Sequence, residues 1–233
     1  MSDRLRIGLV GATGLVGRRV MELAVAREDF SLFAVARREV PLPERVRMEM
    51  FVAEPELWGE VFAAQKPDAI ICALGTTWRK AGQDERAFRA VDQDLALAVA
   101  KAAKRHGAQR FVSVSSVGAD EHSKTFYLRV KGETEQQLAK VGFGRLDILR
   151  PGLLRGPREG DRRILERLGI LASPLVNLTL HGRYRRYRAI DARVVAQAAL
   201  ALAMRRANGR FVHENDAIAR AARDLPMTDG TGR

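Results

Sequence analysis

Short apolar runs alternate with longer amphipathic segments along most of the chain. Each run ends in glycine, proline or polar residues, which is typical of strands. The predicted strands lie at residues 5–10, 31–36, 68–74, 110–115 and 145–149, with a weaker, irregular one at 46–52. Apolar positions of helical period predict helices at 15–26, 54–65, 83–105 and from about 124 onward. This alternation predicts an α/β fold, a Rossmann-like doubly wound parallel sheet with helices on both faces.

The pattern changes after Pro151. Residues 153–161 predict an irregular loop, and 162–180 a partly helical stretch interrupted by Pro174. They are followed by an alanine-rich helix at 191–205 with Asp191 as its N-cap, a strand at 209–213 and a helix at 215–223. We expect one dinucleotide-binding domain over residues 1–225, with a small substrate side built from about 151–225, and a disordered tail at 226–233.

The first predicted strand runs into the sequence G-A-T-G-L-V-G, which begins at Gly11. Gly11 permits a tight exit from the strand, Gly14 lets the backbone approach a pyrophosphate, and Gly17 lets the next helix lie close to the sheet. The first free N–H groups of that helix and its dipole favour phosphate. The predicted phosphate-binding residues are Gly11, Thr13, Gly14, Leu15, Val16 and Gly17. The alternative is a glycine-rich turn that binds no ligand.

The second predicted strand ends in Arg37 and Arg38, where the adenosine ribose of a dinucleotide should lie. An acidic residue there would bind a free 2′-hydroxyl, whereas arginine pairs with a 2′-phosphate. The two arginines therefore favour NADP (NADPH), although Glu39 follows them and both could be ordinary surface residues. The strand at 68–74 is apolar almost throughout, as a central parallel strand is, so Leu74, Gly75 and Thr76 at its end should border the cofactor.

Tyr127 and Lys131 are four residues apart on a predicted helix, so their side chains share one face. A lysine ammonium near the phenol favours phenolate and lets the tyrosine act as acid and base. Ser116, with Ser115 beside it at the end of the preceding strand, is placed to hydrogen-bond a substrate oxygen. The predicted catalytic residues are therefore Ser116, Tyr127 and Lys131. The alternative is an amphipathic helix with an incidental pair.

These motifs together resemble atypical short-chain dehydrogenase/reductase proteins, and in particular the small branch that includes the Tat-interacting protein of animals. The resemblance is carried by the glycine turn and by L-G-T-T at 74–77, K-A-G at 80–82, V-D-Q-D at 91–94, S-S-V-G-A-D at 115–120, Y-L-R-V-K-G-E at 127–133 and R-P-G at 150–152. It implies a Rossmann fold, NADP(H) binding and a Ser/Tyr/Lys site. The further cofactor contacts that it implies are Ser115, Tyr127, Lys131, Pro151, Gly152 and Leu153.

The resemblance leaves the substrate open. We expect an NADP-dependent oxidoreductase that reduces a small carbonyl compound, and the alternative is a cofactor-sensing binding protein. Only about 80 residues follow Pro151, which disfavours nucleotide-sugar epimerisation. The long predicted helix lacks the asparagine that many such enzymes use for proton relay, and Asp92 and Asp94 lie nearby with no assigned role.

Composition adds little chemistry. The single cysteine, Cys72, excludes an internal disulfide and reads as a buried small hydrophobe, and four scattered histidines offer no metal spacing. No apolar run is long enough to span a membrane, and the predicted first strand leaves no room for a signal peptide, so we expect a cytoplasmic protein. An oligomer or a protein partner is left open.

The net charge of +12 comes mostly from arginines spread along the chain. We therefore interpret it as solvated surface and phosphate contacts rather than as a nucleic-acid footprint. Residues 183–188 read R-Y-R-R-Y-R, a basic run that we interpret as an exposed edge strand. Binding of a nucleic acid, or of an anionic substrate beside the nicotinamide, are the alternatives.

Overall fold

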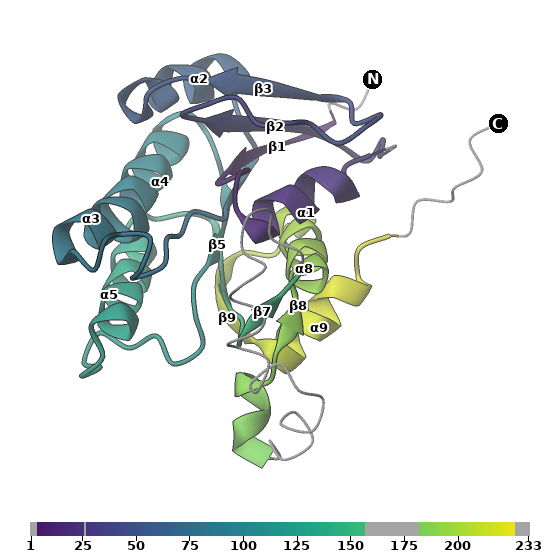
Figure 1. The fold of residues 1–233 in the computed structure, drawn as a ribbon. Helices are drawn as coiled ribbons and strands as arrows, with labels where there is room; N and C mark the ends of the chain where they lie inside the picture. Colours follow the sequence, from purple (N-terminus) through teal and green to yellow (C-terminus); the bar gives the residue numbers. More distant parts are fainter. Residues whose placement is uncertain (1–3, 26, 157–181, 227–233) are drawn as a thin grey trace.

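The computed structural model describes residues 4–25, 27–156 and 182–226. Its centre is a parallel sheet of seven strands in the order β3-β2-β1-β4-β5-β6-β9 (Figure 1). The strands are β1 (Leu5–Val10), β2 (Phe30–Ala36), β3 (Met48–Val52), β4 (Ala69–Cys72), β5 (Arg110–Val114), β6 (Arg145–Arg150) and β9 (Gly209–Glu214). A separate parallel pair is formed by β7 (Leu154–Arg155) and β8 (Ile190–Asp191). The predicted strands and the doubly wound parallel architecture are confirmed.

Helices cover both faces of the sheet (Figure 1). One face carries α1 (Leu15–Leu23), α8 (Ala192–Met204) and α9 (Asn215–Arg223), and the other carries α2 (Trp58–Gln65), α4 (Ala96–Arg105) and α5 (Phe126–Ala139). Asp191 caps α8 as predicted, because its Oδ1 accepts a hydrogen bond from the Arg193 N–H at 2.7 Å. Among the described residues, no helix is long and apolar enough to cross a membrane.

The core has two halves, one on each face of the sheet. In β4, Ala69 and Ile71 belong to the half under α1 and α8, whereas Ile70 and Cys72 belong to the half under α2 and α4. A central parallel strand is buried on both faces, which explains why its sequence is continuously apolar. Cys72 is 1% exposed, as predicted, and burial raises the pKa of its thiol to about 11.

The long predicted helix at 83–105 is divided into three parts. A short helix, α3 (Glu85–Arg89), leads through a π-helical segment, η2 (Ala90–Leu95), into α4. A π-turn holds one extra residue per turn, so it changes the side of the helix on which the following side chains lie. The apolar pattern alone does not reveal this change.

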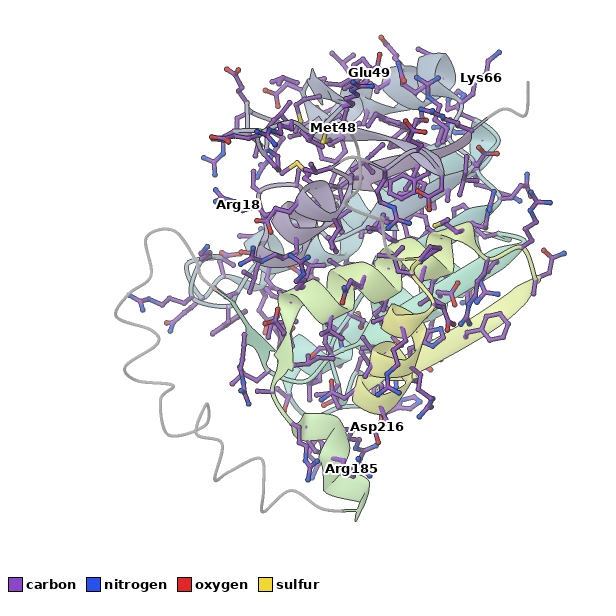
Figure 2. All side chains as sticks on the ribbon, turned by 90° about the vertical axis from the view of Figure 1, so that its right-hand side faces the viewer. Arg18, Met48, Glu49, Lys66, Arg185 and Asp216 are labelled. Carbon is purple, nitrogen blue, oxygen red and sulfur yellow. The ribbon has the colours of Figure 1, made fainter. Side chains whose placement is uncertain are left out.

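The interpretation of the basic run as an edge strand is wrong. Residues Gly182–Tyr187 form a 3₁₀ helix, η3. Arg185 lies 3.7 Å from Asp216 and Arg186 lies 3.5 Å from Glu214, so η3 is held by acids at the start of α9 (Figure 2). These pairings favour a local helix over an extended edge. The loop and partly helical stretch expected at 157–181 and the tail at 227–233 lie outside the described residues.

Candidate active site

Because the central strands are parallel, their carboxyl ends lie along the same side of the sheet. The chain passes from β1 to β2 on one side and places β4 on the other side of β1, so the strand order reverses between β1 and β4. Open parallel sheets bind ligands in the crevice at such a reversal, outside the carboxyl ends of the strands. The residues that the sequence singles out follow these strand ends.

The glycine turn fills the space between β1, β4 and α1. Gly11 has a φ of +92°, and a Cβ there would lie 2.5 Å from the backbone of Ala73 at the end of β4. A Cβ on Gly17 would lie 2.2 Å from the Gly11 carbonyl oxygen, so α1 rests directly on the turn. Gly14 is the N-cap of α1, whose first turn carries no acidic side chain. The first N–H groups of α1 therefore face the crevice without an intrahelical acceptor, as an anion site requires.

The loop that carries Ser116 is tied both to β6 and to α5. Ser115 N–H donates to Leu149 O at 2.7 Å, and Val117 N–H donates to Pro151 O at 3.0 Å. Asp120 N–H donates to Leu128 O at 3.1 Å, which fixes the loop on α5 next to Tyr127. The structure thus brings the Ser116 loop onto the part of α5 that carries Tyr127 and Lys131. Among the described residues, the Ser116 hydroxyl makes only a long contact of 3.4 Å, to Val117 O.

An aromatic cluster orients Tyr127. Its ring packs edge-to-face on Phe88, with centroids 5.5 Å apart, and Phe88 is fully buried. Phe126 and Trp78 continue the cluster, with ring centroids 5.1 Å apart. Within the described part of the chain, the Tyr127 hydroxyl has no hydrogen-bond partner, so its proton is available to a ligand.

Lys131 is paired with a buried acid, Asp92. Its Nζ lies 2.7 Å from Asp92 Oδ1, and the second carboxylate oxygen accepts a hydrogen bond from the Thr76 N–H at 2.7 Å. Lys131 is 6% exposed and Asp92 is 2% exposed. Burial alone lowers the pKa of Lys131, but the charge of Asp92, together with that of Tyr127, raises it, and the net pKa is above the ordinary lysine value. The ammonium therefore stays charged although it is buried.

Asp92 is the site residue to which sequence reasoning assigned no role. It lies in the π-helical segment η2, which turns its carboxylate inward while Asp94 remains exposed. Both acids belong to the V-D-Q-D motif, and a regular helix offers no reason to prefer one of them. The signal that identifies Asp92 is its place between the β4 loop and Lys131, which only the folded chain shows.

Ser115 points its hydroxyl into the protein. The hydroxyl donates to Glu135 Oε1, and the same carboxylate accepts from Arg150 Nε at 3.1 Å. The hydrogen bond to Glu135 raises the pKa of Arg150. Of the two neighbouring serines, Ser116 is therefore the one whose hydroxyl can reach a ligand.

The segment after β6 is anchored from two sides. Gly152 N–H donates to Asn215 Oδ1 at 2.8 Å, and Leu153 O accepts from Ile190 N–H at 2.9 Å. Pro151, Gly152 and Leu153 therefore lie at the carboxyl end of β6, where a cofactor contact was predicted. The Gly152 N–H is bonded to Asn215 and is not free to donate to a cofactor. Leu74, Gly75 and Thr76 follow β4, and Thr76 uses its N–H on Asp92.

Arginines near the carboxyl ends of the strands are candidates to bind an anion. Arg37 and Arg38 are exposed at the end of β2, as is Thr13 in the glycine turn. The Nε and one Nη of Arg155 are buried, and they have no hydrogen-bond partner among the residues that the structure describes. The next residue, Gly156, packs on Leu15, since a Cβ there would lie 2.9 Å from the Leu15 Cδ1. A largely buried guanidinium that has no partner among the described residues, beside a helix N-terminus free of acids, fits a phosphate-bearing ligand.

The fold and this site define a dinucleotide-binding protein of the Rossmann type, and comparison with known proteins agrees. A model described as NAD(P)H-binding matches residues 11–172, and the chain belongs to that family. Its relatives include Protein FMP52, mitochondrial, of Meyerozyma guilliermondii, which is 36% identical over 203 residues that make up 86% of each chain. The protein of the same name from Saccharomyces cerevisiae is 36% identical over 160 residues, 67% of this chain and 69% of that one.

Solved structures agree with the fold. A putative NAD-dependent epimerase/dehydratase from Bacillus halodurans has a TM-score of 0.67 and 25% identity, over 95% of this chain and 100% of that one. UDP-glucose 4-epimerase from Thermotoga maritima has a TM-score of 0.67 at 14% identity, over 94% of this chain and 82% of that one, and shows the fold alone.

The comparisons correct two expectations. The relatives are FMP52 proteins, so the chain is an NAD(P)-binding Rossmann protein of the epimerase/dehydratase type and not specifically a member of the Tat-interacting protein branch. The cytoplasmic expectation is contradicted, because these relatives carry a mitochondrial designation in their names. It rested on the lack of a secretory signal, which says nothing about entry into an organelle.

Proposed function

We propose that this protein is an NADP(H)-dependent oxidoreductase that reduces a small carbonyl compound. The observation that carries the proposal is the buried pair of Lys131 and Asp92 behind Tyr127. Burying two charges is costly, and a hydrophobic pair of similar size is often at least as stable, so such pairs are frequent at functional sites. Here the pair holds a permanent positive charge one helical turn from a phenol whose hydroxyl has no partner among the described residues.

The residues divide the chemistry among them. The bound cofactor supplies the hydride that reduces the carbonyl carbon. The Ser116 hydroxyl donates a hydrogen bond to the carbonyl oxygen, and Tyr127 transfers its phenolic proton to that oxygen as negative charge develops there. The Lys131 ammonium stabilises the tyrosinate that remains until solvent returns the proton. Asp92 keeps Lys131 charged and in place, and is therefore a positioning residue.

Cofactor binding draws on other residues. The N–H groups at the start of α1 and the buried guanidinium of Arg155 would hold the diphosphate, which NAD and NADP share. Arg37, with Arg38 beside it, would pair with the 2′-phosphate that only NADP carries. Replacing Arg155 should therefore weaken binding of both NAD and NADP, whereas replacing Arg37 should weaken binding of NADP alone.

Catalysis by Tyr127 is tested with a panel of aldehydes, ketones and quinones, by following NADPH oxidation. We expect turnover of at least one carbonyl by the parent protein, and a loss of about 100-fold or more in Tyr127→Phe because general acid catalysis contributes on that order. Binding of NADPH to Tyr127→Phe, measured by titration, should remain close to that of the parent. An equally active Tyr127→Phe would refute the mechanism.

The alternative is a cofactor-sensing protein without significant catalysis. Such a protein needs only a conformation that cofactor binding favours, and no proton donor. A parent protein that binds NADPH tightly but turns over no carbonyl in the panel would support this alternative. Retention of Ser116, Tyr127, Lys131 and Asp92 in one region favours the enzyme.

Cofactor preference is tested by titrating the protein with NADPH and NADH. Arg37→Ala should weaken NADPH binding by about 10-fold or more and leave NADH binding unchanged, because a charge-assisted bond to phosphate is worth roughly 1.5–3 kcal/mol. Arg155→Gln is the matched control, since it should weaken both cofactors to the same extent. Equal affinity of the parent for both cofactors, or an Arg37→Ala that binds NADPH as the parent does, would contradict the proposal.

A further inference from the structure

The two tryptophans of the chain lie in opposite surroundings. Trp58 is 3% exposed, and its indole N–H donates to Ala53 O at 2.9 Å. Trp78 lies in the loop that follows the carboxyl end of β4 and is only half-buried. Its indole N–H has no acceptor among the described residues and is open to solvent. A large ring with a free donor at the surface is available to bind a ligand.

Trp78 and the reactive Tyr127 contact the same buried ring. Phe88, in α3, is fully buried, and its ring centroid lies 6.2 Å from that of Trp78 and 5.5 Å from that of Tyr127. Helix α3 lies beside α5 (Figure 1), and Phe126 of α5 completes the cluster, 5.1 Å from Trp78. Direct ring contacts therefore join the indole to the phenol that we propose as the proton donor.

The loop that carries Trp78 is fixed at both ends. Before Trp78, the Thr76 N–H donates to Asp92 Oδ2 at 2.7 Å, and Asp92 is the partner of Lys131. After Trp78 the chain turns back, and the Gln83 N–H donates to Trp78 O at 2.9 Å. The backbone that carries the indole is thus held next to the reactive residues. A ring ordered in advance loses little freedom when a ligand binds.

Within the aromatic cluster, Trp78 is the ring that is left for a ligand. Phe88 is fully buried. The guanidinium groups of Arg89 and Arg129 already lie over the Phe126 ring, at 5.4 Å and 5.7 Å from its centroid. Tyr127 is needed for proton transfer.

We propose that Trp78 binds the ring of an aromatic carbonyl substrate, and this proposal rests on the oxidoreductase function proposed above. An aromatic ring stacks on an indole in an offset or edge-to-face arrangement, and this preference adds to the burial of apolar area. A saturated ring of similar size gains the burial alone. A carbonyl group attached to the stacked ring would lie on the side of Tyr127, where the proposed chemistry takes place.

The cluster suits a polyhydroxylated substrate less well. Each sugar hydroxyl that leaves water needs a new hydrogen-bond partner. The rings of Trp78, Phe88 and Phe126 offer only one donor, the indole N–H, and no acceptor. This side of the site therefore favours a flat, apolar ring over a sugar.

Substrate preference tests the role of Trp78. We compare kcat/KM for benzaldehyde with that for cyclohexanecarbaldehyde, and use the ratio of the two values, because differences in intrinsic reactivity cancel when this ratio is compared between variants. The ratio should fall by about fivefold or more in Trp78→Leu, and stay within about twofold of the parent in Trp78→Phe, since a phenyl ring still stacks. Phe211→Leu is the control: it makes the same kind of change at an exposed aromatic residue of β9, and should leave the ratio unchanged.

Protection from quenching tests binding without turnover. Acrylamide should quench the half-buried Trp78 far more than the buried Trp58. In the complex with NADP⁺, benzyl alcohol should protect the parent from quenching more strongly than cyclohexylmethanol does. In Trp78→Phe, which keeps Trp58 as its single indole, neither alcohol should change the quenching.

An unchanged substrate ratio in Trp78→Leu, an equal fall in Phe211→Leu, or equal protection by the two alcohols would overturn the proposal. A parent protein that turns over no carbonyl compound would instead contradict the proposed function. The protection assay would still decide whether Trp78 binds an aromatic ring, so the two failures are distinguishable.

Discussion

Lys131 keeps its charge in the protein interior because Asp92 raises its pKa, and the sequence does not reveal that Asp92 is its partner. Lys131 was predicted from its spacing to Tyr127, and the prediction of its place on α5 holds. Its partner could not be chosen from sequence, because the π-turn decides whether Asp92 or Asp94 faces inward. The choice between Ser115 and Ser116 is similar: the sequence favours Ser116, and the reason, the bond from Ser115 to Glu135, appears only in the fold.

Replacing Asp92 should move the pH dependence of the reaction. In Asp92→Asn the burial of Lys131 is no longer opposed by a carboxylate, so the pKa of Lys131 should fall. The alkaline limb of the rate profile should then move to lower pH, because neutral Lys131 no longer stabilises the tyrosinate. The measurement is kcat against pH for both proteins with the best carbonyl substrate.

Asp94→Asn is the matched control, since it makes the same chemical change at an exposed position and should leave the profile in place. Stability gives a second readout. The pKa of Lys131 is raised by folding, so its contribution is complete below the ordinary lysine value of about 10.4 and is lost only as pH rises through the raised value. Unfolding by urea should therefore show no loss from this group between pH 7 and 9 in the parent. An unchanged profile in Asp92→Asn would contradict the role of Asp92.

At the scale of elements, strands and helices with clear periodicity were predictable and irregular ones were not. β4 and α8 follow from their apolar patterns, because packing on the sheet demands those patterns. The segment η3 was misassigned, since its arginines pair with acids near the start of α9, and these acids are distant in sequence. The contact between the Ser116 loop and α5 likewise depends on Gly132, which the pattern of apolar residues does not single out.

Substitution of Gly132 gives a testable prediction at the scale of elements. A Cβ on Gly132 would lie 2.2 Å from the backbone N of Glu121 and 2.3 Å from the carbonyl carbon of Asp120. Backbone atoms cannot move aside as a flexible side chain can, so Gly132→Ala should displace the loop from α5. We expect a loss of about 1–3 kcal/mol in the free energy of unfolding. Activity should fall further than the folded fraction does, because Ser116 is displaced.

Gly59→Ala provides the comparison, as another glycine in a helix. A Cβ there would meet only the Ala102 Cβ at 3.9 Å, so this change should be neutral or stabilise α2 by about 0.5–1 kcal/mol. Both values come from chemical denaturation followed by circular dichroism. A Gly132→Ala protein as stable and active as Gly59→Ala would show that the contact does not position the loop.

At the scale of the whole molecule, the sequence predicts a doubly wound sheet. It predicts neither which strands form the edges of that sheet nor which segments, distant in sequence, lie together at the site. Alternation of strand and helix leaves the place of β9 open, because a late strand can join the sheet at either edge. The site has the same property: it unites the turn after β1, the loop after β4 and the segment after β6, which are separated by more than half of the chain.

Hydrogen exchange tests this assembly, since cofactor bound across the crevice should slow exchange at all of its borders together. We expect NADPH to protect residues 11–17, 74–76 and 151–155 in parallel, with the midpoint of each at the same cofactor concentration. Residues 209–214, which form β9 at the edge of the sheet, serve as the internal control, and their protection should not respond to NADPH. Protection confined to residues 11–17 would mean that the cofactor contacts only the glycine turn, and that the segment after β6 does not belong to the site.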